Sequence, residues 1–197
     1  MYYVLQISER YVFLFLEKLV VVNNGSLCNV KPYLQLYRDN IITLIPIAAD
    51  GGHRYNDGTS YVGTWNTEGK RQGEGHLQLP DGTRYDGMFE NGLFHGIGVL
   101  RFPDGAKYEG EFFDGWFHGY GIFWRSDGMK HEGEFRAGKI WGLGLTTFSD
   151  NTNGFPRNEG FFHDCQMKTS SKCPQVIKKA QRVAFMARNQ YTEKIKA

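Results

Sequence analysis

The feature that most constrains this chain is a five-residue segment that returns at nearly regular intervals. A tyrosine, a glycine and a second aromatic residue stand at its alternate positions, as in Tyr108, Gly110 and Phe112. The segment occurs at 61–65, 85–89, 108–112 and 131–135, where His131 replaces tyrosine, and a degenerate copy lies at 158–162. The copies begin 23 to 27 residues apart. A period of this length is typical of tandem repeats in which each copy forms one supersecondary unit.

Each copy predicts one β-hairpin. Side chains alternate between the faces of a strand, so Tyr108 and Phe112 share one face while Glu109 and Glu111 share the other. A turn containing glycine follows, a second glycine pair opens an apolar strand, and an Asp-Gly turn leads to the next copy. Since a lone hairpin is only marginally stable in water, we expect the copies to pair into one sheet.

Glycine between two aromatic residues has a physical reason. Without a Cβ atom it leaves a hole in the face of the sheet, across which we expect an aromatic ring to lie. Ring pairs in stacked or edge-on geometry add about 0.5–1.5 kcal/mol each beyond burial. The fold class is therefore predicted to be mainly β, an elongated single-layer antiparallel sheet of tandem hairpins.

The pattern from Tyr108 through Gly110, Phe112, Gly115 and His118 to Gly121 resembles the MORN repeat (membrane occupation and recognition nexus), over about 55–162. The segments at 90–94, 155–160 and 176–189 further resemble a small member of that family. The resemblance implies a single-layer repeat sheet with a C-terminal helix. It also implies binding to the tail of a class III myosin in actin-rich projections of sensory cells.

The two ends of the chain lack the repeat. Residues 174–196 predict an amphipathic helix that begins at Pro174 and caps the array, with its edge also contacting a ligand. We expect three domains: a non-repeat extension at 1–54, poorly ordered or an artefact of the gene model; the array at 55–162; and a linker and helix at 163–197.

The favoured function is a protein-binding scaffold, not an enzyme, whose groove takes an extended peptide. The predicted contacts combine aromatic anchors, an acidic rim that attracts a basic peptide and one edge of the helix. The anchors are Tyr85, Phe89, Tyr108, Phe112, Trp116 and Phe135; the rim is Glu90, Glu109, Glu111, Glu132 and Glu134; the helix edge is Val176, Ala180 and Val183. The competing interpretation is that these rings only hold the sheet together.

The uneven distribution of charge along the chain is compatible with a second function. Residues 61–160 hold 14 acidic and 10 basic residues, whereas 161–197 hold 2 acidic and 8 basic ones. A basic C-terminal helix could bind acidic phospholipid, which makes a membrane-associated adaptor the alternative. Nucleic-acid binding is disfavoured because the aromatic residues are not interleaved with lysine and arginine.

No catalytic motif or metal-ligand spacing is present, so we expect no cofactor, no metal and no small-molecule substrate. His95 and His118 share a repeat position, and we expect each to hydrogen-bond within its own hairpin and not to form a metal ladder. The three cysteines fit no zinc pattern, which favours free thiols in a reducing cytoplasm.

Overall fold

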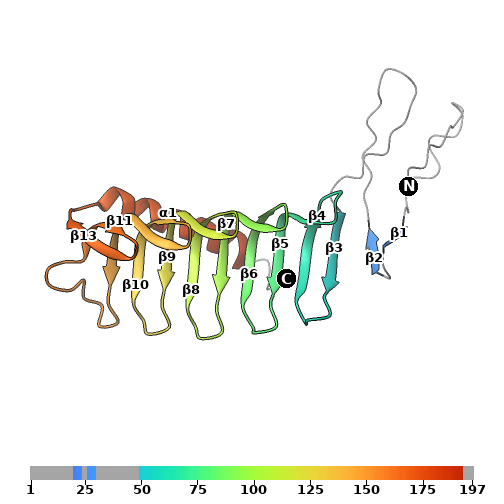
Figure 1. Cartoon of the computed structure of the whole chain (residues 1–197), viewed down its shortest axis with the longest axis horizontal. Coiled ribbons are helices and arrows are strands. Elements are labelled where there is room, and N and C mark those ends of the chain that lie inside the picture. Colours follow the sequence, from blue (N-terminus) through green and yellow to red (C-terminus); the bar gives the residue numbers. More distant parts are fainter. Residues whose placement is uncertain (1–19, 24–25, 30–48, 193–197) are drawn as a thin grey trace, which may run out of the picture.

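The structure is a computed structural model that describes residues 20–23, 26–29 and 49–192. Thirteen strands lie side by side in chain order, and each pairs antiparallel with its neighbours (Figure 1). The first two are β1 (Val20–Asn23) and β2 (Ser26–Asn29), and a single register pair, Asn29 with Asp50, joins β2 to the rest. The sheet forms an open ribbon one layer thick, which confirms the fold predicted from the repeat.

The remaining eleven strands form the array. They are β3 (Ala49–Arg54), β4 (Ser60–Trp65), β5 (Arg71–Gln78), β6 (Arg84–Glu90), β7 (Leu93–Arg101), β8 (Lys107–Phe113), β9 (Trp116–Trp124), β10 (Lys130–Arg136), β11 (Lys139–Thr147), β12 (Glu159–His163) and β13 (Gln166–Ser170). The array thus starts at residue 49 and ends at 170, where the sequence placed its limits at 55 and 162. Other residues of the predicted extension, 1–19, 24–25 and 30–48, lie outside the described part of the chain.

Two-residue turns join the strands of the central hairpins. Asn91 and Gly92 have φ of 51° and 90°, and Asp114 and Gly115 have 48° and 85°. Positive φ at both central residues is the type I′ geometry, whose twist matches that of paired strands. The N–H of Gly115 also donates to the carbonyl of Phe94 in the preceding hairpin, at 2.9 Å, so successive turns are tied together.

One face of the sheet carries a continuous layer of rings, which we call the ring layer. Its buried members are Tyr61, Leu77, Tyr85, Phe89, Leu100, Tyr108, Phe112 and Phe135, with partly buried residues such as Phe94 and Phe117 packed against them. Ring contacts run from hairpin to hairpin: Tyr85 meets Phe112 edge-on at 5.0 Å, and Tyr108 meets Phe135 at 5.0 Å. Each repeat is therefore stabilised by its neighbours.

A row of glycines crosses the sheet beneath these rings in cross-strand register. Its members are Gly51, Gly63, Gly75, Gly87, Gly98, Gly110, Gly121, Gly133, Gly144 and Gly160. A Cβ atom at Gly121 would stand 2.4 Å from the Tyr108 hydroxyl oxygen. The hydroxyl donates to the carbonyl of Glu111 at 3.0 Å, so the glycines are required by where the tyrosines lie.

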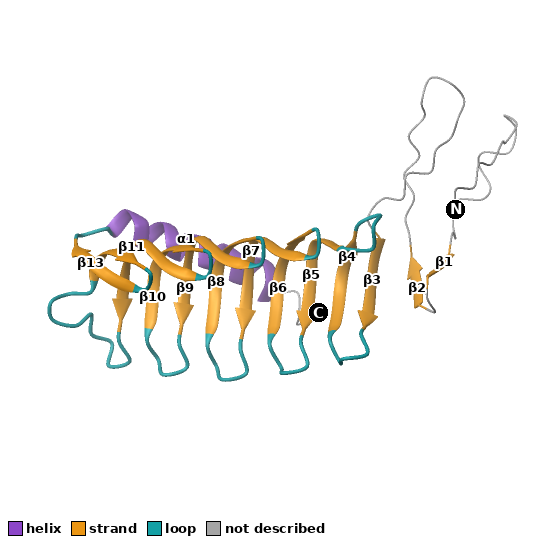
Figure 2. Cartoon of the chain, viewed as in Figure 1, coloured by secondary structure: helices purple, strands orange, loops and turns teal. Residues whose placement is uncertain are grey.

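The opposite face carries the helix α1 (Pro174–Thr192), which begins with Pro174 as the sequence predicts. It runs along the sheet from β11 to β6, behind the strands in the view of Figure 2. Lys179 Nζ lies 3.9 Å from the Tyr120 ring on one side of the glycine row, and Gln181 bonds Glu132 on the other. The helix therefore lies lengthwise over the glycine row and covers a face of the array.

Candidate functional site

Five of the six predicted aromatic anchors are buried inside the ring layer. Tyr85, Phe89, Tyr108, Phe112 and Phe135 are each at most 4% exposed. Tyr85 stacks on Phe94 at 3.9 Å and Tyr108 on Phe117 at 4.0 Å. Burial raises the pKa of the Tyr108 hydroxyl well above its usual range, so this group stays a hydrogen-bond donor. In this structure the five rings are packing partners of one another and are not exposed at the surface.

The sixth anchor, Trp116, is 60% exposed and lies at the turn edge of the ring layer. Together with Leu100, Phe117 and the turn glycines Gly115 and Gly138 it lines a hollow of about 230 Å³. The indole lies over Gly138, where an added Cβ would approach it to 2.9 Å. Leu93, 49% exposed, stands at the equivalent edge of the preceding hairpin. The turn edge therefore offers an apolar strip that is open to a partner.

The predicted acidic rim does not surround this strip. Glu109 and Glu132 lie on the opposite face and are 1% and 4% exposed. Arg188 of α1 donates to Glu109 from Nε and Nη2, at 3.0 and 2.6 Å to Oε2, and Lys107 Nζ lies 2.8 Å from Oε1. The carboxylate raises the pKa of the Arg188 guanidinium in turn. These two glutamates hold the helix on the sheet.

The carboxylates of Glu111 and Glu134 accept hydrogen bonds from backbone N–H groups. Glu111 Oε2 accepts the N–H of Tyr120 at 2.5 Å, and Glu134 Oε2 accepts the N–H of Leu143 at 2.6 Å. Both sit beside bulges in the pairing of their strands, where the ladder leaves an N–H to be bonded. Glu90 is exposed, and its Oε2 lies 3.2 Å from His95 Nε2 in the same hairpin.

The helix residues predicted to touch a ligand face the sheet. Ala180 and Val183 are 0% and 6% exposed, and Val176 is half-buried. Sequence reasoning missed two apolar residues on the outer side of α1, Phe185 and Met186, which are 57% and 40% exposed. Their position could be found from the helical period, because both fall off the apolar stripe of Ala180, Val183, Ala184 and Ala187.

Among the described residues, no cluster of histidine, cysteine and acidic side chains is arranged to hold a metal ion. Cys165 and Cys173 are free thiols, exposed and buried respectively. The helix found in the described range is not long and apolar enough to cross a membrane.

The fold and these surfaces define a tandem β-hairpin repeat protein, a class whose units share one continuous core. Four consecutive matches to the MORN repeat cover residues 61–84, 85–107, 108–130 and 131–153. The chain is also 68% identical, over 140 residues, to the MORN repeat-containing protein 4 homolog (retinophilin) of Drosophila melanogaster, and the match covers 71% of each protein. The chain belongs to the MORN repeat family.

Proposed function

We propose that this protein is a non-catalytic scaffold that binds an extended segment of a partner protein. The partner that the resemblance to small MORN proteins favours is the tail of a class III myosin. The corresponding place is the cytoplasm of actin-rich projections such as filopodia, stereocilia or rhabdomeres. The observation that carries the proposal is the apolar strip at the turn edge of the ring layer, with its hollow beneath Trp116.

The strip suits an extended chain for geometric reasons. Exposed apolar side chains recur at corresponding turns of neighbouring hairpins, Leu93 in one and Trp116 in the next. Strands two apart in a sheet are separated by about 9–10 Å. A segment running across the hairpins could therefore place an apolar side chain at each turn, with an aromatic or aliphatic anchor in the hollow.

Titration calorimetry with a class III myosin tail peptide tests this proposal. Trp116→Ala removes one of the five residues that line the hollow. Truncation of a central aromatic contact costs about 2 kcal/mol or more, which is a loss of about 30-fold in affinity. Phe155→Ala is the matched control, because Phe155 is fully exposed on the loop between β11 and β12. Unchanged affinity of the Trp116 variant would refute the site.

A second candidate function is attachment to acidic membranes through α1. Phe185 and Met186 are exposed on the outer side of the helix, and Lys178 and Arg182 are exposed on the same element. Each basic residue near an anionic surface contributes about 1 kcal/mol. Co-sedimentation with phosphatidylserine vesicles, compared between the parent protein and Phe185→Ser, measures this membrane attachment. A parent protein that stays in the supernatant at low salt is not a membrane adaptor.

A further inference from the structure

Two neighbouring turn ends of the array carry an unbalanced negative charge. Residues 88–96 and 111–119 contain three acidic residues and no lysine or arginine, whereas the next turn end, 134–142, contains Arg136 and Lys139. The acidic residues of the first two turn ends are Glu90, Glu111 and Asp114. An incoming cation would therefore meet no lysine or arginine that belongs to these two hairpin ends.

Phe113 is an exposed ring on the second of these turn ends. It is the register partner of Trp116 and is 51% exposed. The His95 ring of β7 lies 5.3 Å from it, and the His118 ring of β9 lies 5.6 Å from it. Strand β8, which carries Phe113, lies between these two strands. The two imidazoles thus flank the ring and leave about half of its surface open.

Glu111 stands two residues before Phe113 on the same face of β8, roughly 7 Å away along the strand. Its Oε2 accepts the N–H of Tyr120, whereas its Oε1 has no partner among the described residues and is open to solvent. No lysine or arginine of the described chain forms an ion pair with it. Lys179 of α1 lies instead over the Tyr120 ring, at 3.9 Å. The charge of Glu111 is thus available to a ligand.

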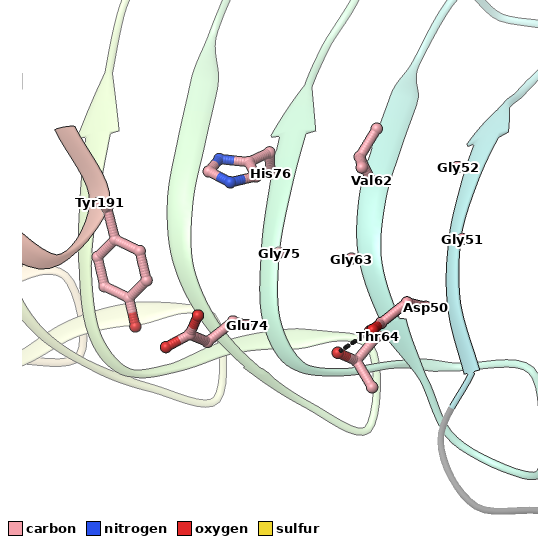
Figure 3. Close-up of a pocket in the computed structure, with 10 residues that line it drawn as sticks. All are labelled: Asp50, Gly51, Gly52, Val62, Gly63, Thr64, Glu74, Gly75, His76 and Tyr191. Atoms are coloured by element: carbon pink, nitrogen blue, oxygen red, sulfur yellow. Dashed lines mark hydrogen bonds between the residues drawn. The ribbon is translucent and has the colours of Figure 1, made fainter. Parts of the chain in front are cut away.

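The fold does not require a carboxylate at this position of the repeat. The equivalent residues are Thr64 in the first repeat and Met88 in the second, and each stands beside the same shift in strand register. Thr64 donates its hydroxyl to Asp50 at 3.0 Å (Figure 3), and Met88 carries no charge. The three hairpins share one fold with three different residues here, which leaves the carboxylate of Glu111 free for another role.

The next hairpin supplies a template for a cation at this place in the repeat. Arg136 stands at the repeat position of Phe113, and Trp141 stands at that of His118. The Arg136 guanidinium lies over the Trp141 ring, 5.6 Å from its centroid. The ring quadrupole attracts a guanidinium to an aromatic face. Phe113 offers such a ring, and no lysine or arginine of the described chain lies over it.

We propose that Phe113 and Glu111 together bind an arginine side chain carried by the partner segment. The guanidinium lies on the open side of the Phe113 ring and donates to Oε1 of Glu111. Arginine suits this pair because its planar group can stack on a ring while the N–H groups at its edge reach a carboxylate. The inference rests on the proposed function, since Trp116 of the apolar strip is the register partner of Phe113. It places the arginine close to the side chain that enters the hollow.

The test uses the full chain and acetylated, amidated pentapeptides of sequence Ala-Ala-X-Ala-Ala, where X is arginine or citrulline. Citrulline keeps the planar shape of arginine and removes its charge. Binding is followed by the amide shifts of Glu111, Phe113 and His118 in two-dimensional NMR. We expect the arginine peptide to bind about fivefold more tightly, because an exposed cation–π contact and an exposed ion pair each contribute modestly. Equal binding of the two peptides would overturn the proposal.

Variants locate the site. Glu111→Gln keeps an acceptor for the Tyr120 N–H and removes the charge, so it should abolish the preference for arginine over citrulline. Glu134→Gln is the matched control, because Glu134 accepts the Leu143 N–H in the same way but has Arg136 where Glu111 has Phe113. It should leave the preference unchanged. A preference that survives Glu111→Gln, or that Glu134→Gln removes as well, refutes this site.

The pentapeptides carry no apolar anchor, so their binding does not depend on the hollow at Trp116. The two proposals can therefore fail separately. A Trp116→Ala variant that binds the myosin peptide normally refutes the proposed site at the hollow and leaves the arginine preference intact. Equal binding of the arginine and citrulline peptides refutes the arginine site, whatever the affinity of the myosin peptide.

Discussion

Replacing His131 is expected to remove most of the acid sensitivity of the fourth repeat. This histidine stands where the first three repeats have tyrosine, and its ring is 1% exposed. Its Nδ1 lies 3.0 Å from the Thr146 hydroxyl, while its Nε2 is buried without a partner among the described residues. Burial lowers its pKa from 6.5 to about 3, because the site cannot solvate an imidazolium.

The loss of folding stability at low pH follows from the difference between the pKa of His131 in the unfolded and folded chains. The unfolded chain takes up a proton as the pH falls through 6.5, and the folded chain does not until about 3. The stabilising contribution of neutral His131 is therefore complete above pH 6.5 and is lost between pH 6.5 and 3. At pH 5 the loss is about 2 kcal/mol, since each pH unit below the unfolded pKa costs about 1.4 kcal/mol.

Two variants separate titration from hydrogen bonding. His131→Phe and His131→Tyr should both lose about 2 kcal/mol less than the parent protein between pH 8 and pH 5. At pH 8 only His131→Tyr should gain stability, by about 1 kcal/mol, because its hydroxyl can donate to the backbone as Tyr108 does to Glu111. Urea unfolding followed by far-UV circular dichroism at the two pH values measures both. Equal acid losses in parent and His131→Phe would show that His131 is not held neutral.

Three further variants test the packing of the sheet and the helix by the same urea unfolding. Arg188→Met should cost about 1–3 kcal/mol, because it takes the helix donor from the buried carboxylate beneath it, whereas Arg182→Met, at an exposed position, should change stability by less than about 0.5 kcal/mol. Gly121→Ala should cost about 1–3 kcal/mol, since the added methyl meets a buried tyrosine ring, while Gly52→Ala, with 3.6 Å to its nearest neighbour, should cost little. Ala137→Gly should stabilise the protein by about 0.5–1 kcal/mol, because Ala137 has φ of 49° in its turn, and an unchanged midpoint would argue against that strain.

The hairpins and their turns were predictable because their causes are local. Asn91-Gly92 and Asp114-Gly115, each between two alternating strands, form type I′ turns, and each turn fixes the register of the strands beside it. The ring over a glycine is nearly as local, since Tyr108 covers Gly110 in its own strand and Gly121 in the next. The helix at 174–192 likewise follows from Pro174 and an apolar period.

The binding residues were harder to predict, because a repeat position that looks like a ligand contact is also a packing position. Tyr85 and Phe112 pack against each other in the ring layer, with their ring centroids 5.0 Å apart. Trp116 is exposed, unlike those two rings, because it stands beside the turn at the edge of its hairpin. The residues next to it in the sequence do not indicate that exposure. The exposed rings are known once the hairpins are stacked.

The sequence by itself determined the elements: the number and phase of the array hairpins, the turns between them, the glycine row and the C-terminal helix. Short-range sterics and alternation decide all of these. The tertiary structure decided which face α1 covers, and hence that Glu109 and Glu132 are buried while Asp50 and Glu74 remain exposed. That choice depends on contacts between residues up to 116 positions apart, such as Glu74 with Gln190, which no local pattern encodes.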